Sequence, residues 1–340
     1  MRSTSRRATI MFCVLTALLV PGRLSAQTGL SLPAAFHATI MASGFTEPTA
    51  ITIGPDRRLY VAQQNGAFLA FNGHTTVTIA SVPGVPLGLA WHGQTLYASW
   101  TGHISRLTPS SGYRSFRSRV IVSGLPVGKH QNDGLTFRGG WMYVGVGSTC
   151  NACTESDARS ATIMRFHLDG RHAQIYARGL RNPYGLAFRP ATGRLYATDN
   201  GRDDYGNSVP DELNLIRQGG NYGWPNCWGR GQGAGCAGTI PPVAEFEPHS
   251  SADGLVFYTG VTFPRRYRGD AFVAEWGDSV NGLGTGHILK RVHFAGSHAT
   301  VSTFATGFSH PLALAVGPDS SLLVADWGTG IIWSIQANGH

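Results

Sequence analysis

One sequence pattern recurs six times along this chain, and this repeat constrains the fold more than any other feature. Each copy has a small or Pro/Gly start, an alternating apolar strand, a Gly or Asp turn, and a second strand rich in Tyr, Val and Ala. The clearest copy pairs 133–137 with 141–145. The six copies begin near Pro48, Leu87, Asp133, Tyr184, Asp253 and Pro311.

Repeats at intervals of roughly forty to seventy residues, each followed by further strands, predict an all-β fold, a six-bladed β-propeller. A single blade cannot bury its own faces, so closure requires all six copies. Segment 36–41 is expected to complete the last blade as an outer strand. No change in composition marks a linker, so we expect one domain over 28–338. A β-sandwich or two smaller sheets would also fit regular short strands.

The first 26 residues have the pattern of a signal peptide. The segment begins with positively charged arginines and continues with an apolar stretch too short to span a bilayer. It ends in Leu24-Ser25-Ala26, a plausible cleavage site. We therefore expect export to the periplasm or the cell exterior, with no membrane span. Cleavage removes four arginines and no acid, which lowers the formal net charge from +8 to +4. With no Lys/Arg cluster besides, a nucleic-acid partner is not expected.

Four cysteines remain after cleavage. An even number in an oxidising compartment predicts disulfides, and four cysteines allow three pairings. The two local pairings are favoured, Cys150 with Cys153 and Cys227 with Cys236. A structural zinc site is the alternative, although the second spacing is long for a zinc knuckle.

Five of the chain's 19 acids crowd into fourteen positions between Asp199 and Glu212, among Gly, Asn and Pro. Oxygen-rich side chains on a tight loop are what a hard cation such as calcium requires. Asp and Asn also favour turns because they bond their own backbone. The stretch therefore predicts either a calcium site or an ordinary turn-rich loop.

Four motifs in the same region resemble the glucose/sorbosone dehydrogenase family, the soluble quinoprotein sugar dehydrogenases, and especially its sorbosone branch. They are GLRNP at 179–183, GLAF at 185–188, DELN at 211–214 and GGNYGWP at 219–225. Weaker similarity extends over most of the chain after the N-terminus. The resemblance implies oxidation of an aldose or sugar aldehyde with pyrroloquinoline quinone (PQQ) and calcium. It also implies an external electron acceptor, a cytochrome or a quinone.

The resemblance assigns roles to residues just before two of the repeated strands. A histidine can take a proton near neutral pH, and the resemblance implies that His130 removes the sugar's hydroxyl proton while hydride passes to the quinone. Gln131 beside it is assigned to the cofactor. A guanidinium fork binds carboxylate or quinone oxygens, and the resemblance implies that Arg181 and Asn182 lie against the quinone.

The metal is assigned to the acid-rich loop. The resemblance implies that the backbone carbonyls of Gly201 and Arg202 hold a calcium ion that also touches the quinone and polarises it. Asp211 is expected near the bound waters, and Asp203 is an alternative direct ligand.

The chain departs from the glucose enzymes at four places. A glutamine is replaced within 82–86, a lysine within 276–279 and arginines within 309–311, and the acid that orients the histidine falls near Ser148. Unpaired buried carboxylates are costly, so other groups are expected to compensate. Glu155 is a candidate partner of His130. The candidate cations are Lys129, Arg202, His249, Lys290 and His310.

Two other functional classes remain open. One is a metal-dependent hydrolase of the lactonase kind, with Asp199, Asn200 and Asp253 directed at the channel. It requires carboxylates from several blades on the axis, whereas the acids of this chain concentrate in one. The other is a non-catalytic secreted propeller, stabilised by calcium, that binds glycan or protein through tryptophans. Those tryptophans are Trp91, Trp100, Trp141, Trp276 and Trp327.

Overall fold

The computed structural model describes residues 29–278, 284–296 and 298–339, so the expected signal peptide lies outside the described residues. Nearly all regular structure in this part of the chain is β-strand. The exceptions are short 3-10 helices at Ser111–Tyr113, Gly206–Ser208 and Arg265–Tyr267. No helix here is long and apolar enough to cross a membrane.

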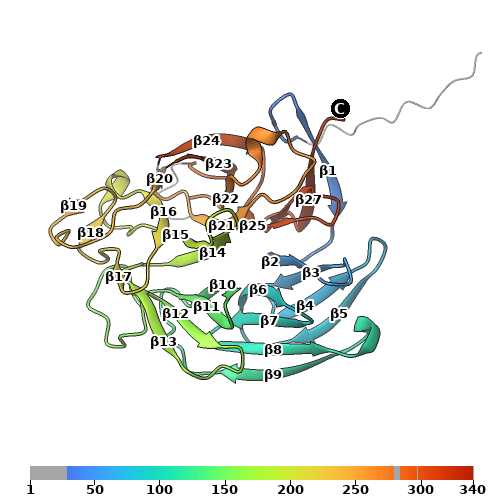
Figure 1. The fold of residues 1–340 in the computed structure, drawn as a ribbon, viewed down its shortest axis with the longest axis horizontal. Helices are drawn as coiled ribbons and strands as arrows, with labels where there is room; N and C mark the ends of the chain where they lie inside the picture. Colours follow the sequence, from blue (N-terminus) through green and yellow to red (C-terminus); the bar gives the residue numbers. More distant parts are fainter. Residues whose placement is uncertain (1–28, 279–283, 297, 340) are drawn as a thin grey trace, which may run out of the picture.

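The strands form six antiparallel blades around a central axis (Figure 1), as the repeats predict. Blade 1 consists of β2 (Pro48–Ile53), β3 (Leu59–Gln63), β4 (Ala67–Phe71) and β5 (Thr76–Ser81). Blade 2 consists of β6 (Pro86–His92), β7 (Thr95–Trp100), β8 (His103–Pro109) and β9 (Phe116–Val122). Blade 3 consists of β10 (Asn132–Arg138), β11 (Trp141–Val146), β12 (Thr162–His167) and β13 (Gln174–Arg178).

The second half of the chain repeats the arrangement. Blade 4 consists of β14 (Pro183–Arg189), β15 (Arg194–Asp199), β16 (Asp211–Ile216) and β20 (Ala244–Phe246). Blade 5 consists of β21 (Ala252–Phe257), β22 (Ala271–Glu275), β23 (Ile288–Ala295) and β24 (His298–Thr306). Blade 6 consists of β25 (Pro311–Val316), β26 (Leu322–Asp326), β27 (Ile331–Ala337) and β1 (Phe36–Ala42).

The N-terminal strand closes the ring. β1 pairs antiparallel with β27, in a register that runs from Phe36 opposite Ala337 to Ala42 opposite Ile332. The two strands lie side by side in Figure 1 although they come from opposite ends of the chain. The prediction of an outer strand at 36–41 is therefore confirmed.

Three further strands lie in the long segment between β16 and β20. β17 (Gly220–Asn221) adds to blade 3 parallel to β13, while β18 (Cys227–Trp228) and β19 (Gln232–Gly233) form a small hairpin. Both predicted disulfides are present, Cys150–Cys153 between β11 and β12 and Cys227–Cys236 across this hairpin. Since all four sulfurs are bonded in pairs, the alternative of a structural zinc site is wrong.

Glycines near the axis let adjacent blades approach closely. A Cβ at Gly185 of β14 would lie 2.3 Å from the carbonyl oxygen of Asp253 in the next blade. A Cβ at Gly254 would lie 2.2 Å from that of Leu312, one blade further on. Backbone this close excludes any side chain, so the repeated glycine is a packing requirement.

The second strand of a blade is buried on both faces because it packs between neighbouring blades. All five residues of β3 and all five of β26 are buried. This explains their near-continuous Leu, Val, Tyr and Ala content, since a strand covered on both faces does not alternate. The hydrophobic clusters accordingly lie between blades, as where Tyr60 of blade 1 meets Leu89 and Leu96 of blade 2.

Candidate functional site

The loops that carry the predicted site gather at one end of the axis. His130 lies just before β10, and Arg181 and Asn182 lie just before β14, while Gly201 follows β15. The first strand of each blade starts, and the second strand ends, at this same end, because the two are antiparallel neighbours. Loops far apart in the sequence therefore converge there.

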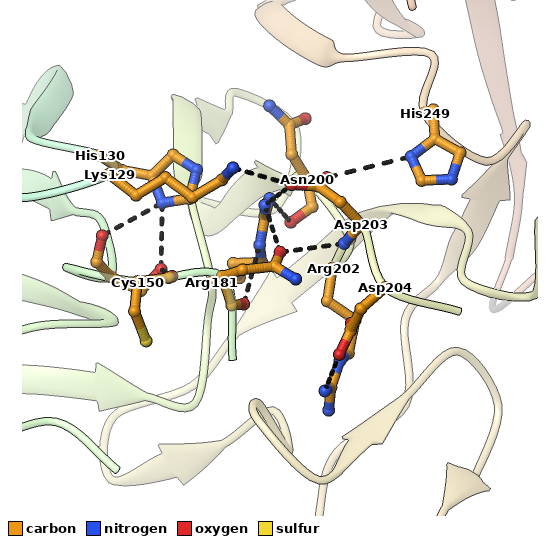
Figure 2. A network of polar contacts seen from close by, with 12 residues as sticks. Lys129, His130, Cys150, Arg181, Asn200, Arg202, Asp203, Asp204 and His249 are labelled. Atoms are coloured by element: carbon orange, nitrogen blue, oxygen red, sulfur yellow. Dashed lines mark hydrogen bonds and ion pairs between the residues drawn. The ribbon is translucent and has the colours of Figure 1, made fainter. Parts of the chain in front are cut away.

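These loops enclose a cavity of about 210 Å³. Figure 2 labels Lys129, His130 and Arg181 among the residues that line it. Six of the predicted site residues line it, whereas Gln131 and Arg202 do not. The lining residues are Lys129, His130, Arg181, Asn182, Asn200, Gly201, Asp203, Asp211, His249 and Ser251. A second cavity of about 320 Å³ shares Lys129, His130 and Asn182 with it and reaches Gln131. The two together form one polar recess at the mouth of the axis.

His130 is held in a single tautomer. Its Nδ1 lies 3.0 Å from Ser148 Oγ and 3.1 Å from Ser148 O. The Ser148 hydroxyl donates its own hydrogen to the Cys150 carbonyl at 2.7 Å, so Nδ1 must carry the hydrogen of the first pair. Nε2 is then the basic nitrogen.

A serine thus stands where the resemblance places an orienting acid. The suggestion that Glu155 orients His130 is wrong. Its carboxylate accepts instead from the backbone N–H of Thr149 at 2.7 Å and from the Thr149 hydroxyl at 2.5 Å.

The environment keeps His130 neutral. Burial, followed by the positive charge of Arg181, lowers the pKa of His130 to about 3. An imidazole with this pKa is unprotonated throughout the neutral range. Its free nitrogen is therefore available in the neutral range to accept a proton from a bound hydroxyl.

Arg181 is almost fully buried, at 4% exposed, and several protein groups bind its guanidinium. Its guanidinium donates to the Asn151 side chain at 2.8 Å, to Asp203 Oδ2 at 2.8 Å and to the Asn200 carbonyl at 3.2 Å. Lys129 Nζ lies 3.0 Å from the same Asp203 oxygen. One carboxylate therefore joins two cations at the cavity wall, as Figure 2 shows.

Asn151 is a site residue that the sequence reasoning missed. Its side-chain oxygen accepts from Arg181 and from the Asp203 backbone N–H at 3.0 Å. Its carbonyl accepts from the Trp224 indole at 3.1 Å and from Arg181 Nε at 3.2 Å. The position of Asn151 between the two cysteines of the C-x-x-C pair is the signal that could have found it, since a disulfide there fixes a tight loop.

The acid-rich loop is tied to the next blade through Asp211. Asp211 Oδ1 accepts from the Gly201 N–H at 2.8 Å, while Oδ2 accepts from Ser250 Oγ at 3.1 Å and from the Ala252 N–H at 3.2 Å. No residue in the described ranges donates a hydrogen bond to the carbonyl oxygen of Gly201 or of Arg202. These oxygens are therefore available to a ligand.

Arg202 does not supply a cation to the cavity. Its guanidinium donates to Asp204 at 2.5 and 2.6 Å and to the Pro225 carbonyl at 2.6 Å. It also stacks over the ring of Tyr205 at 4.7 Å. Figure 2 shows this pair turned away from His130, so the expectation that its side chain compensates is wrong.

Of the other candidate cations, Lys129 and His249 line the cavity. Lys290 instead pairs with Glu247 at 2.7 Å, outside the lining. His310 belongs to an aromatic cluster with Trp276, at 4.3 Å between ring centroids, and Trp327, at 5.8 Å. Two of the five candidates are thus placed where they could meet a cofactor.

Gln131 is occupied by a neighbouring blade. Its amide donates to the Val85 carbonyl at 2.8 Å and accepts from the Thr101 hydroxyl at 2.8 Å. It therefore braces the loop before β10 against blade 2, and it faces the second cavity rather than the first.

Acids from three blades do approach one another beside the axis, contrary to the expectation that they concentrate in one. Burial raises the pKa of Asp133, with further contributions from Asp253 and Asp199, and burial raises that of Asp253 to about 8. Among the residues that the structure describes, however, these acids form no group with ligand atoms all within 4.8 Å of one another. The geometry that a central hydrolytic metal requires is not formed by these carboxylates.

Comparison with known proteins places this geometry in a family. The model of one family, described as glucose/sorbosone dehydrogenase, matches residues 119–298, more than half of the chain. The chain belongs to this family. The matched span contains His130, Arg181, Asn182 and the whole acid-rich loop.

Two curated relatives give the extent of the similarity. An uncharacterized protein of Borreliella burgdorferi is 23% identical over 87% of this chain and 88% of its own length. The aldose sugar dehydrogenase YliI of Escherichia coli is 27% identical over 42% of this chain and 44% of its own length.

Several solved structures share the fold of this chain. A Trichoderma reesei carbohydrate-active enzyme of family AA12 superposes with a TM-score of 0.80 at 18% identity, covering 91% of this chain and 98% of that one. The PQQ-bound aldose sugar dehydrogenase of Streptomyces coelicolor superposes with a TM-score of 0.72 at 22% identity, covering 91% and 100%. The two superpositions show that the fold of nearly the whole described chain occurs in both of these enzymes.

Proposed function

We propose that this protein is a sugar dehydrogenase that oxidises an aldose or sugar aldehyde with PQQ as cofactor. The observation that carries the proposal is a neutral, single-tautomer His130 on the wall of a polar cavity that also contains Arg181 and Asn182. Family membership supports the reaction class. The name of the Escherichia coli relative and the PQQ bound in the Streptomyces structure support the substrate class and the cofactor.

The residues present fit a quinone carrying three carboxylates. Lys129, Arg181 and His249 provide positive or hydrogen-donating groups on the cavity wall. The side-chain oxygens of Asn182 and Asn200 have no hydrogen-bond partner among the described residues although they are buried. Buried polar atoms normally find partners, so these two indicate that a polar group or ion completes the site.

The protein's own contribution to the reaction is proton transfer and orientation. His130 Nε2 accepts the proton of the substrate hydroxyl while Ser148 fixes the ring through Nδ1. Arg181 and Lys129 place positive charge at the cavity wall, where it can stabilise negative charge that develops during the reaction. When bound, the quinone supplies the acceptor for the two electrons of the oxidation.

Calcium is proposed to bind at the carbonyl oxygens of Gly201 and Arg202, with Asp211 shaping the loop and Asp203 as an alternative ligand. Oxygen atoms of this kind suit a hard cation, and neither carbonyl is used by another described residue. Asp203 already forms ion pairs with Lys129 and Arg181. As a direct ligand, its carboxylate would have to bind calcium in addition to these two cations.

Export is part of the proposal. Two disulfides are typical of proteins that fold in an oxidising compartment, which supports a periplasmic or extracellular location. Electrons would then pass to an external acceptor, a cytochrome or a quinone.

The test is a titration of purified apoprotein with PQQ and calcium, followed by absorbance, and then dye reduction with a panel of aldoses. Stoichiometric quinone uptake with sugar-dependent dye reduction is expected. His130→Ala should keep the uptake and lose the reduction. Calcium raising the melting temperature while the quinone never binds would contradict the proposal and favour a calcium-stabilised binding protein.

A further inference from the structure

An aromatic residue opposes an arginine at one register position in three blades. Tyr97 faces Arg106 in blade 2, Tyr143 faces Arg165 in blade 3, and Phe272 faces Arg291 in blade 5. In blade 5 the arginine is neutralised, because Arg291 lies 2.6 Å from Asp270. Arg106 and Arg165 have no carboxylate partner among the described residues. Arg106 is exposed, while Arg165 is half-buried and donates to the neutral Gln174 side chain at 2.8 and 2.9 Å. Blades 2 and 3 thus keep a guanidinium charge that no carboxylate neutralises, whereas in blade 5 Asp270 neutralises it.

Arg165 lies in a cleft of about 500 Å³ between blades 3 and 4. Four arginines line this cleft, and none of them forms an ion pair within the described part of the chain. They are Arg138, Arg165, Arg194 and Arg217. The floor is aromatic, with Arg165 over the Tyr176 ring at 5.3 Å and Arg138 over the Phe188 ring at 5.4 Å.

Arg106 lies in a second cleft, of about 520 Å³, at the edge of blade 2. Arg117 and Arg119 line it too, and Arg106 stands directly opposite Arg119 on the adjacent strand. Like charges in this position destabilise a sheet. No acid occurs between residues 57 and 132, so blade 2 itself supplies none to offset them. The Tyr97 hydroxyl on this face donates to the Leu168 carbonyl of blade 3, so the two clefts flank blade 3.

Both clefts lie at the end of the blades opposite the candidate active site. β10 and β14 begin at the site and run seven residues to Arg138 and Arg189. At about 3.3 Å per residue they cover roughly 20 Å. A ligand here would not be the substrate of the proposed reaction.

We propose that these clefts bind an acidic saccharide, a sugar chain with carboxylate groups. Guanidinium forks bind carboxylates through paired, charge-assisted hydrogen bonds. The aromatic floor and the aliphatic wall formed by Leu195 and Ile216 suit the C–H face of a sugar ring. Sulfate or phosphate esters on a sugar would present the same chemistry, and consecutive clefts on either side of one blade suit a ligand with several charged units.

The test measures binding of trigalacturonate to the full-length exported protein by calorimetry at low ionic strength. Binding is expected for trigalacturonate and none for the neutral trisaccharide maltotriose. Arg165→Gln/Arg217→Gln should weaken the affinity about tenfold or more, because each lost guanidinium removes hydrogen bonds to a charged group. Arg265→Gln, which removes an exposed arginine far from both clefts, is the matched control and should leave the affinity within about twofold.

Arg165 also stacks on Trp141 at 4.3 Å, so its substitution could disturb folding. A second variant therefore separates loss of binding from loss of folding. Arg217→Gln alone, an exposed position, should weaken binding with an unchanged melting temperature. Inorganic phosphate should compete with trigalacturonate only weakly if the clefts bind a saccharide. A sulfated trisaccharide that binds, and that the same variants weaken, would show that the clefts accept sulfate as well as carboxylate groups. Equal binding of maltotriose, equal weakening by Arg265→Gln, or binding to anionic lipid vesicles without binding to trigalacturonate would each overturn the proposal.

Discussion

Ser148 is the hydrogen-bond partner that fixes the His130 ring, while burial gives the proposed base an unusual titration. Burial and the charge of Arg181 lower the pKa of His130 to about 3. The folded protein therefore binds no proton at this ring between about pH 4 and 8, whereas the unfolded chain does below about pH 6.5. This difference in proton binding makes folding less favourable as the pH falls from 6.5 toward 3.

We predict that the His130 ring in the apoprotein does not titrate between pH 5 and 8. The measurement is the chemical shift of its ring carbon by NMR, assigned by comparison with His130→Ala. His74, an exposed histidine on another loop, is the internal control. A midpoint near pH 6.5 for His130 would contradict the buried, single-tautomer geometry.

Asn151 gives a second prediction at the residue scale. Asn151→Ala removes the oxygen that accepts from Arg181 and from the Asp203 backbone. Hydrogen bonds to charged groups contribute about 1.5–3 kcal/mol each, so we expect quinone affinity to fall about tenfold or more. Quinone titration by absorbance measures this, and Asn207→Ala, an exposed asparagine nearby, should change nothing. Unchanged affinity in Asn151→Ala would show that Arg181 does not depend on this loop.

The places of His130, Arg181 and Asn182 on the cavity wall could be predicted because the resemblance names these residues and each lies in the loop before a strand of the repeated pattern. The contacts of Ser148 and Asn151 could not be predicted, because they join residues 18 and 30 positions apart. The sequence points only to their loop, through the resemblance at Ser148 and the C-x-x-C spacing around Asn151. The wrong expectations for Arg202 and Glu155 have a related origin. Both residues lie in loops that border the site. Their charged groups, however, bond to partners close in the sequence, Asp204 for Arg202 and Thr149 for Glu155.

At the scale of elements, the loop between β11 and β12 joins the two halves of the site. Its disulfide, Cys150–Cys153, holds the Cys150 carbonyl that orders Ser148 and the Asn151 that orders Arg181. The other disulfide, Cys227–Cys236, closes a hairpin beside the site. The two bonds are therefore predicted to differ in how much each contributes to stability and to activity.

We predict that removing Cys150–Cys153 costs less stability but more activity than removing Cys227–Cys236. Chain entropy gives about 2 kcal/mol for the four-residue loop and about 3 kcal/mol for the ten-residue loop. Denaturant unfolding and dye reduction of the paired Cys→Ser variants measure the two effects. Equal loss of activity in both would mean that the first loop does not position the site.

The strands themselves could largely be predicted from alternation and from the repeat, including β1 as the closing strand. β17 could not. Two residues, Gly220 and Asn221, pair with β13 in the preceding blade. Such a short pairing leaves no periodic signal, and it depends on a loop whose path is set by tertiary contacts.

At the scale of the whole molecule, a buried acid makes the stability of the fold depend on pH. Glu275 is fully buried, and neither of its oxygens has a hydrogen-bond partner among the described residues. Burial raises the pKa of Glu275 to about 9, with Lys290 opposing and Glu247 and Asp211 adding to the shift. The folded state therefore retains a proton that the unfolded state releases above about pH 4.5.

We predict that Glu275→Gln flattens the fall in stability between about pH 4.5 and 9. The wild type should lose up to about 1.4 kcal/mol per pH unit from this group. The variant should melt higher than the wild type at pH 8 and alike at pH 4.5. Thermal melts across this range measure the effect, with the half-buried Glu245→Gln as control. An unaltered slope would mean that Glu275 is charged in the folded protein.

The pairing of β1 with β27 brings the two ends of the described chain to one place. His37 and Asn338 are 301 positions apart in the sequence, yet their side chains are hydrogen bonded at 2.9 Å, and Asn338 also donates to the Ala34 carbonyl. Adjacent termini are the condition under which circular permutation is tolerated. A short linker from Asn338 to Ala34, with new ends opened in the β8–β9 turn, would convert the closing strand into a continuous hairpin. The ring would then be sealed by covalent connection within blade 6 and by non-covalent pairing within blade 2.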